Sequence, residues 1–250
     1  MSIYSVFFSP TGGTSKVNSI LTGVYDDVKV IDLIENNEYR ENFCENDIVY
    51  IAVPSFGGRV PGYAADVISK LHGGNALAVI VCVYGNRAYE DTLIELKNIV
   101  KEAGFKTAAA VSAIAEHSIM HRFAKGRPDN DDVKQLEEFA RKIKSVLTYG
   151  NYHDVQVPGN IPYKEFKGIP MIPSSNSKCT KCGICAAKCP VHAIPIESPE
   201  KTDKDKCISC MHCISVCPEN ARSLNKLMVE AASLKMHKLF EERKENELFI

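Results

Sequence analysis

The sequence of 250 residues has no hydrophobic run close to the about 20 residues that a membrane-spanning helix needs. It also has no excess of charge, since 30 lysines and arginines oppose 31 aspartates and glutamates. Without a strong overall field, the composition indicates neither nucleic acid nor an anionic membrane as a partner. The first eight residues lack the basic segment of a signal peptide, and Pro10 and Gly12 follow at once. We therefore expect a cytoplasmic protein.

Cysteine, by contrast, is abundant and unevenly placed. Eight of the ten cysteines fall within residues 179–217, in two runs that each read C-x2-C-x2-C-x3-C-P. The runs consist of Cys179, Cys182, Cys185 and Cys189, and of Cys207, Cys210, Cys213 and Cys217. In a reducing compartment such clustering indicates metal ligands rather than disulfides. Structural zinc is an alternative, although zinc sites use paired CxxC groups with a longer gap.

The two cysteine runs belong to an internal repeat of residues 179–194 and 207–222, in which the cysteines, the proline and a later alanine coincide. The run is typical of bacterial two-cluster ferredoxins, in which the fourth cysteine of each run ligates the other cluster. This resemblance implies two [4Fe–4S] clusters, serving electron transfer or structure alone. The implied ligand sets are Cys179, Cys182, Cys185 and Cys217, and Cys207, Cys210, Cys213 and Cys189. We assign no role to His192 and His212.

Residues 1–149 alternate between strand-like and helix-like segments. Residues 76–83 are apolar throughout, as in a central parallel strand, and residues 131–147 repeat apolar side chains at helical spacing. The predicted strands are 3–8, 28–33, 47–53, 76–83 and 106–114, and the predicted helices are 16–25, 61–71, 88–103 and 131–147. We predict an α/β domain with a doubly wound, five-stranded parallel sheet.

The rest of the chain is expected to form three further parts. Residues 150–177 carry four prolines and no periodic pattern, which indicates an extended linker able to wrap along a domain surface. Residues 178–223 are predicted to form a small α+β domain around the clusters. Residues 224–250 are predicted to form a C-terminal helix whose apolar stripe packs on its own protein. The alternative for this stripe is a contact with a partner or with a second copy in a homodimer.

A loop rich in hydroxyls and glycines joins the first predicted strand to the first helix. It contains Ser9, Thr11, Gly12, Gly13, Thr14 and Ser15. Hydroxyls and free N–H groups at a helix N-terminus suit a phosphate, although a capped turn without a ligand is the alternative. The loop has neither the Walker A ending nor the GxGxxG pattern of dinucleotide sites. In an open α/β sheet, ligands bind beyond the carboxyl ends of the strands, where residues 54–61 and 84–90 also lie.

These loops resemble those of flavodoxins, which bind FMN, and the resemblance covers residues 1–148. It implies that residues 9–14 hold the phosphate, and that Phe56 and Tyr89 lie against the inner and outer flavin faces. Backbone contacts to the ring are implied for Gly57, Gly58, Gly85 and Asn86. The remaining expected flavin-site residues are Pro54, Ser55, Arg59, Tyr84 and Arg87. The whole chain resembles the fused flavodoxin–ferredoxin proteins of anaerobic bacteria and archaea.

Two features depart from the flavodoxin pattern. The sequence contains no tryptophan, the residue that flavodoxins often place against the inner face. Arg59 and Arg87 stand where flavodoxins are often acidic or neutral. Positive charge there would stabilise the anionic hydroquinone and raise the flavin potential. The alternative is that both arginines are solvated or bridge to acidic residues.

The resemblance implies an electron carrier in which clusters deliver single electrons to an FMN, with a ferredoxin or an oxidoreductase as donor or acceptor. An alternative is a flavin-dependent oxidoreductase that reduces a quinone, a nitro compound or dioxygen through Arg59, Arg87 and His117. His117 follows the fifth predicted strand and is a candidate proton donor to flavin N5 or to a substrate, unless its loop is merely surface. A third hypothesis, supported only by the tail, is redox sensing or assembly.

Overall fold

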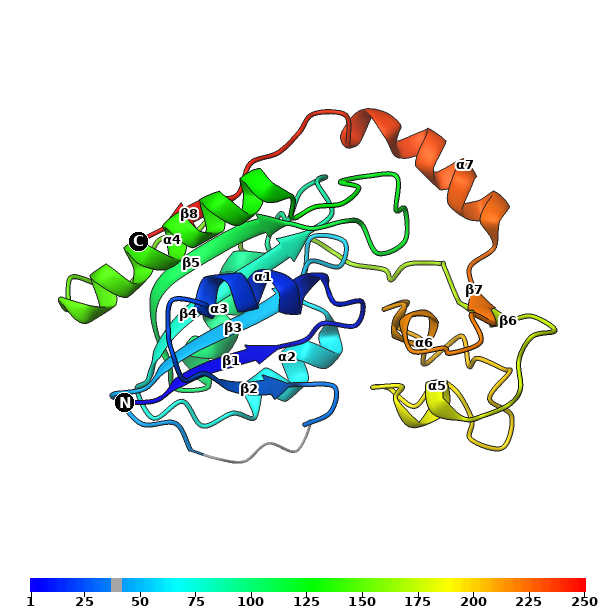
Figure 1. The fold of residues 1–250 in the computed structure, drawn as a ribbon, viewed down its shortest axis with the longest axis horizontal. Coiled ribbons are helices and arrows are strands. Elements are labelled where there is room, and N and C mark those ends of the chain that lie inside the picture. Colours follow the sequence, from blue (N-terminus) through cyan, green and yellow to red (C-terminus); the bar gives the residue numbers. More distant parts are fainter. Residues whose placement is uncertain (37–41) are drawn as a thin grey trace.

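The parallel sheet forms where the sequence predicts it. The structure, a computed structural model, describes residues 1–36 and 42–250. Five parallel strands lie in the order β2-β1-β3-β4-β5 (Figure 1). They are β1 (Ile3–Phe7), β2 (Lys29–Asp32), β3 (Ile48–Pro54), β4 (Leu77–Tyr84) and β5 (Lys106–Ile114). This order is that of the flavodoxin-like doubly wound fold. The predicted fold class is therefore confirmed, with one addition at the sheet edge.

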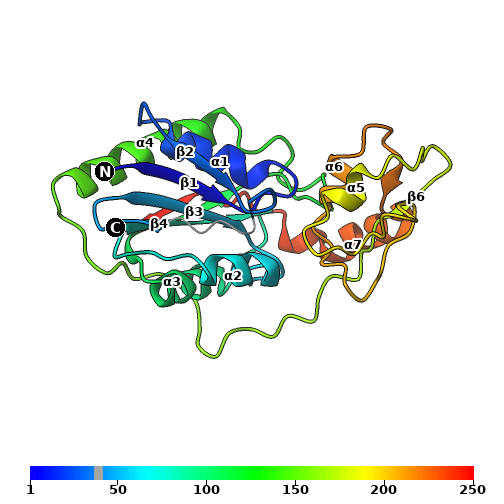
Figure 2. The same cartoon turned by 90° about the horizontal axis from the view of Figure 1, so that it is seen from below.

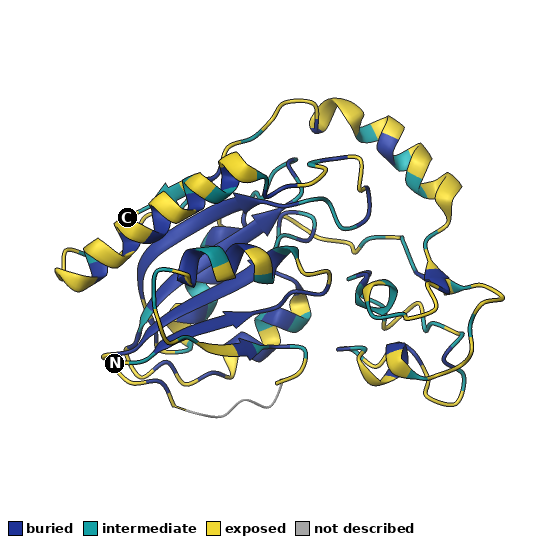
Figure 3. Cartoon of the chain, viewed as in Figure 1, coloured by how far each residue is buried: buried dark blue, intermediate teal, exposed yellow. Residues whose placement is uncertain are grey.

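Four helices cover the two faces of the sheet and form two hydrophobic cores (Figure 2). They are α1 (Gly13–Thr22) and α4 (Asn130–Thr148) on one face, and α2 (Gly62–Ser69) and α3 (Thr92–Glu102) on the other. Along β3, Val49 and Ile51 pack in the core of α2 and α3, while Tyr50 and Ala52 pack in the core of α1 and α4. Burial on both faces explains why the central strands β3 and β4 are continuously apolar (Figure 3).

The sheet has a sixth strand, which corrects the prediction of five strands and of a wholly helical tail. After α7 (Lys226–Met236) and a 3-10 turn at His237–Leu239, the chain extends back to the sheet. There β8 (Glu247–Phe249) pairs antiparallel with β5. It therefore satisfies backbone groups that an edge strand would otherwise leave open. No helix in the described part of the chain is long and apolar enough to cross a membrane.

Side chains from distant loops hold the segment between α7 and β8. The amide nitrogen of Asn86 donates to the carbonyls of Phe240 and Glu242, at 3.0 and 2.8 Å. The amide oxygen of Asn86 accepts from the N–H of Lys244 at 2.9 Å. The side chain of Asn246 accepts an N–H from β5 at 2.9 Å. Buried polar groups thus fix the tail. The periodicity of apolar residues along the tail does not predict these hydrogen bonds.

The linker wraps along α3 (Figure 2). Asp91 lies at the start of this helix and is 2% exposed. Its carboxylate accepts the backbone N–H groups of Asn160 and Lys164, at 2.8 and 2.7 Å. Lys97 of the same helix donates to the carbonyl of Val155 at 2.7 Å. These charge-assisted bonds fix the path of the linker toward the cysteine-rich region.

The cysteine-rich region folds as two equivalent halves. A short helix occupies the same repeat position in each half, α5 (Ile184–Ala187) and α6 (His212–Ser215). The residues before these helices, Gly183 and Met211, both have positive φ, of 78° and 65°. Strands β6 (Ser174–Ser175) and β7 (Arg222–Ser223) pair antiparallel at the side of the halves. The sequence repeat is therefore also a structural repeat.

Candidate functional site

The hydroxyl-rich loop before α1 is shaped by its own serines. The Oγ of Ser9 accepts the N–H of Ser15 at 2.9 Å, and the Oγ of Ser15 donates to the carbonyl of Gly12 at 3.0 Å. Gly12 has φ of 86°, a conformation that glycine adopts without strain. Thr11, Gly13 and Thr14 are left to line a cavity at the N-terminus of α1. The loop thus offers hydroxyls and backbone donors that fit a phosphate.

The cavity lies beyond the carboxyl ends of the parallel strands and continues into a larger one. The first measures about 110 Å³ and the second about 510 Å³. The second is within the range of roughly 300–1,000 Å³ usual for small-molecule sites. Residues common to both cavities are Ser55, Gly57, Tyr84, Gly85, His117, Ile119 and Ile169. Pro54 and Phe56 line the first cavity, and Arg87 lines the second.

One wall of the larger cavity comes from outside the sheet domain. The linker contributes Phe166, Ile169 and Met171, and the tail contributes Met236 and Phe240. Sequence reasoning missed these residues as site residues. The sequence feature that could have indicated them is the presence of apolar side chains within the proline-rich linker and on the apolar stripe of the tail. The wall is apolar, as suits the body of a flat aromatic ligand.

Several residues that we predicted for the flavin site line neither cavity. Gly58, Arg59, Asn86 and Tyr89 are absent from the described lining of both cavities. The hydroxyl of Tyr89 donates to the Glu247 carboxylate at 2.6 Å. The Asn86 side chain binds the tail through the contacts described above. The side chains of Tyr89 and Asn86 thus serve the attachment of the tail. The roles of all four residues in holding a flavin stay predictions without support from their positions.

The two arginines of the flavin loops are both paired with carboxylates. Arg59 donates from Nε and Nη2 to Glu95, each at 2.7 Å. Arg87 donates to both oxygens of Glu90, at 2.9 and 2.8 Å. These ion pairs offset the positive charge that we expected to raise the flavin potential. The geometry favours the alternative, that both arginines bridge to acidic residues.

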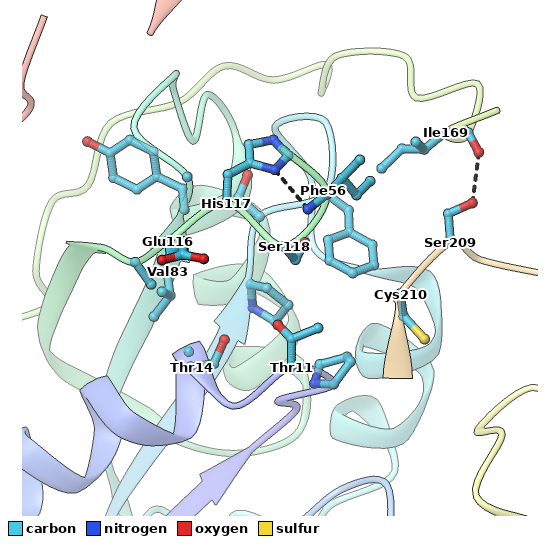
Figure 4. Close-up of a pocket in the computed structure, with 18 of the residues that line it drawn as sticks. Thr11, Thr14, Phe56, Val83, Glu116, His117, Ser118, Ile169, Ser209 and Cys210 are labelled. Atoms are coloured by element: carbon cyan, nitrogen blue, oxygen red, sulfur yellow. Dashed lines mark hydrogen bonds between the residues drawn. The ribbon is translucent and has the colours of Figure 1, made fainter. Parts of the chain in front are cut away.

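His117 is held as a neutral hydrogen-bond donor. Its Nδ1 accepts the backbone N–H groups of Ile119 and Met120, at 3.1 and 3.2 Å, and Figure 4 shows its ring at the cavity. An accepting Nδ1 leaves the hydrogen on Nε2 of the neutral ring. Burial lowers the pKa of His117 to about 4. The ring lines both cavities and can therefore offer a hydrogen bond, but it is a poor source of a full proton near neutral pH.

The structure brings cysteines of the two runs together in a crossed pattern. Cys179, Cys182, Cys185 and Cys217 line one cavity, so three thiols of the first run meet the last thiol of the second. In the other set, Cys210 interacts electrostatically with Cys213, Cys189 and Cys207. These groupings have the same members as the ligand sets that the ferredoxin resemblance implies, and the ligand sets themselves stay predictions. Burial raises the pKa of Cys210 to about 12.

This arrangement differs from a site for one metal ion. In residues 1–36 and 42–250, no group of three or more His, Cys, Asp and Glu side chains is placed to hold a single ion. A zinc ion would draw four thiolates to about 2.3 Å from one point. A cluster instead keeps its thiolates apart, each on a different iron, which fits cysteines arranged around a cavity.

The second cysteine run is docked on the hydroxyl-rich loop. Nδ1 of His212 and the Oγ of Ser215 both donate to the carbonyl of Pro10, at 2.8 and 2.9 Å. Ser209 and Cys210 line the first cavity, and the Oγ of Ser209 donates to the carbonyl of Ile169 at 2.8 Å (Figure 4). A predicted cluster ligand and the predicted flavin site therefore share a wall. His212, to which we assigned no role, is one of the residues that join the domains.

The cysteine-rich region matches a known domain family. Residues 163–222 match the family described as the 4Fe-4S dicluster domain. The match begins within the predicted linker and ends at the first residue of β7. A search of curated proteins finds no match.

Solved structures similar to the chain include two bacterial flavodoxins. The flavodoxin of Streptococcus pneumoniae TIGR4 is 17% identical, with a TM-score of 0.40, over 58% of this chain and 99% of its own. The Fusobacterium nucleatum flavodoxin bound to flavin mononucleotide is 17% identical, with a TM-score of 0.39, over 58% of this chain and 98% of its own. The flavodiiron core of Flv1 from Synechocystis is 16% identical, with a TM-score of 0.40, over 60% of this chain and 36% of its own.

The assignment of the first domain rests on its own strand order, and that of the second on the family match and on the cysteine repeat. The chain therefore joins a flavodoxin-like α/β domain to a ferredoxin-like 4Fe-4S dicluster domain.

Proposed function

We propose that the protein transfers single electrons between two [4Fe–4S] clusters and an FMN bound beyond the carboxyl ends of the sheet strands. One observation carries the proposal. Cys210 lines the same cavity as Thr11 of the hydroxyl-rich loop and the aromatic ring of Phe56 (Figure 4). Because electron transfer becomes steeply slower with distance, a cluster ligand in the wall of the flavin site favours direct transfer within one chain.

The residues that would hold the cofactors follow from the cavities. Cys179, Cys182, Cys185 and Cys217 would hold one cluster, and Cys207, Cys210, Cys213 and Cys189 the other. Thr11, Gly13 and Thr14 would bind the FMN phosphate at the start of α1. A bound flavin supplies a group that stores one or two electrons, whereas each cluster carries one.

The protein side chains orient the flavin and exclude water from it. Phe56 offers an apolar ring surface, and His117 offers the Nε2 hydrogen to an acceptor atom of the ring. Phe166 and Met236 close the larger cavity from the linker and the tail. We prefer a carrier over an oxidoreductase because Arg59 and Arg87, which the alternative would use, are already engaged by Glu95 and Glu90.

The cluster farther from the flavin site is the contact point that we propose for a redox partner. Cys182 in its ligand set is exposed, as are the neighbouring Lys181 and Ile184. Cys210, in the other set, faces the flavin cavity. Electrons would therefore pass between a partner protein and the FMN through both clusters in turn.

Cofactor content and stepwise reduction test this function. Protein purified without oxygen is expected to contain about eight irons per chain, as two [4Fe–4S] clusters require, together with FMN. Stepwise reduction should bleach the clusters and the flavin without rapid turnover of quinones, nitro compounds or dioxygen. Protein that binds clusters but no flavin would contradict the proposal, and fast turnover of one acceptor would favour the oxidoreductase.

A methyl group at Gly85 is expected to weaken FMN binding. A Cβ built there would lie 2.7 Å from Cδ2 and 2.8 Å from Cβ of His117, so the histidine has to move. Overpacking of this kind costs about 1–3 kcal/mol, and an equal loss of binding free energy would lower the affinity roughly 5- to 150-fold. The measurement is FMN affinity of Gly85→Ala by fluorescence titration. Gly62→Ala is the matched control because nothing lies within 4 Å of its Cβ position. Equal affinity of both variants would exclude this placement of the flavin.

A further inference from the structure

Arg222 is a buried arginine that lies against the cysteines of the first cluster set. It is 2% exposed and lines the cavity of Cys179, Cys182, Cys185 and Cys217. Among the described residues, no carboxylate forms an ion pair with it. A buried charge without a counter-charge is costly. The position therefore calls for an anion that the protein itself does not supply.

The hydrogen bonds of Arg222 orient its guanidinium without neutralising it. Nη1 donates to the carbonyl of Pro199 at 2.7 Å and to the Oγ of Ser175 at 3.3 Å. Nη2 donates to the Oγ1 of Thr202 and, at 3.4 Å, to the carbonyl of Pro173. Nε is buried and has no hydrogen-bond partner in the described part of the chain. The side chain thus keeps a full positive charge and one free donor.

The guanidinium acts on thiols of both cluster sets. Nη1 lies 3.8 Å from the Sγ of Cys185, a ligand of the first set. Cys213 packs against the small apolar cluster that contains Cys185. Cys213 belongs to the second set, so Arg222 stands within electrostatic reach of both clusters.

The internal repeat has this charge in one half only. Ile194 occupies the position of Arg222 in the first half of the repeat. It is 4% exposed and packs with Cys185 and Ala186 in a small apolar cluster. One half therefore has an apolar side chain where the other has a cation. The asymmetry points to a role in the electrostatics of the clusters.

We propose that Arg222 raises the reduction potentials of the two clusters. This inference rests on the proposed function, because it requires the clusters to be bound. On reduction a cluster gains one electron and one negative charge. The guanidinium is always protonated and offsets this charge without uptake of a proton. Its free Nε–H is a donor available to a cluster sulfur, and such hydrogen bonds raise the potential of iron–sulfur centres.

The test is a redox titration of the full chain, followed by EPR spectroscopy, for wild type and Arg222→Gln. We expect the midpoint reduction potential of at least one cluster to be lower in Arg222→Gln than in wild type. The expected shift changes the ratio of reduced to oxidised cluster about tenfold at a fixed potential, which corresponds to 59 mV for one electron. Arg222→Lys, which keeps the charge, should shift less. Lys204→Gln removes the same charge from an exposed site of the same domain. Midpoints in Arg222→Gln equal to those in Lys204→Gln would overturn the proposal.

If Arg222→Gln does not retain its clusters, a second measurement that relies on wild-type protein tests the proposal. Wild-type protein with ¹⁵N-labelled arginine is partly reduced and studied by pulsed EPR. Coupling of an arginine nitrogen to a reduced cluster, absent in Arg222→Lys, supports the proposal, and its absence from wild type overturns the proposal. Wild type that holds no clusters would instead contradict the proposed function itself, so the two failures are distinguishable.

Discussion

Replacing Cys179 and Cys217 together by alanine is expected to remove one cluster and leave the other. The iron content should fall from about eight to about four per chain, as expected for loss of one of two [4Fe–4S] clusters. The reason is that both thiols line the same cavity, although they belong to different runs. Iron and sulfide analysis with EPR of the reduced protein measures the result.

A second pair of substitutions separates crossed from uncrossed ligation. Cys207 and Cys217 lie in the same run, and the crossed pattern places them in different ligand sets. Replacing both by alanine is therefore expected to remove both clusters. Uncrossed ligation predicts the reverse, with both clusters lost in the first double variant and one in the second. Cys44→Ala serves as the control, since Cys44 is an exposed cysteine outside both runs.

Replacing His212 and Ser215 together by alanine is expected to slow electron transfer from cluster to flavin while both cofactors stay bound. The two side chains donate to the carbonyl of Pro10 and attach the second cysteine run to the hydroxyl-rich loop. Two such bonds contribute about 2 kcal/mol, which corresponds to roughly 30-fold in the docking equilibrium. Neither side chain is a predicted cofactor ligand, so cluster and flavin content should not change.

The measurement for this variant is the rate of flavin reduction after rapid reduction of the clusters. We expect the rate to decrease, by up to the roughly 30-fold loss in the docking equilibrium, because undocked molecules hold the clusters farther from the flavin. His153→Ala with Ser177→Ala is the matched control, because both residues are exposed. An unchanged rate in the His212 and Ser215 variant would show that these contacts do not set the distance between the cofactors.

The parts of the fold that the sequence predicts are those with a local physical cause. The strand at Leu77–Tyr84 is buried on both faces, so every side chain in it is apolar. Helix Asn130–Thr148 shows its buried face as a repeat of Leu136, Phe139, Ala140 and Ile143. The cysteine sets followed from spacing together with a family resemblance. For the strand and the helix, neighbours in the sequence carry the whole signal.

The parts that the sequence does not predict depend on contacts between distant segments. Glu247–Phe249 is three residues long and becomes a strand only because the edge of β5 is free to pair with it. Tyr89 has the sequence position of a flavin-stacking residue, but its hydroxyl donates a hydrogen bond to the carboxylate of Glu247. Phe166 enters the wall of the cavity that we propose for the flavin because Asp91 anchors the linker nearby. No pattern among neighbouring residues predicts these contacts between distant segments.

The central claim is that clusters and flavin exchange electrons within one chain. The most direct test is to reduce the clusters with a short pulse and to follow cluster reoxidation and flavin reduction over a range of protein concentrations. The shared wall of Cys210, Thr11 and Phe56 predicts that both signals change with one rate constant that does not depend on concentration. A flavin reduction rate that rises in proportion to protein concentration would contradict the claim, because the electrons would then pass between molecules.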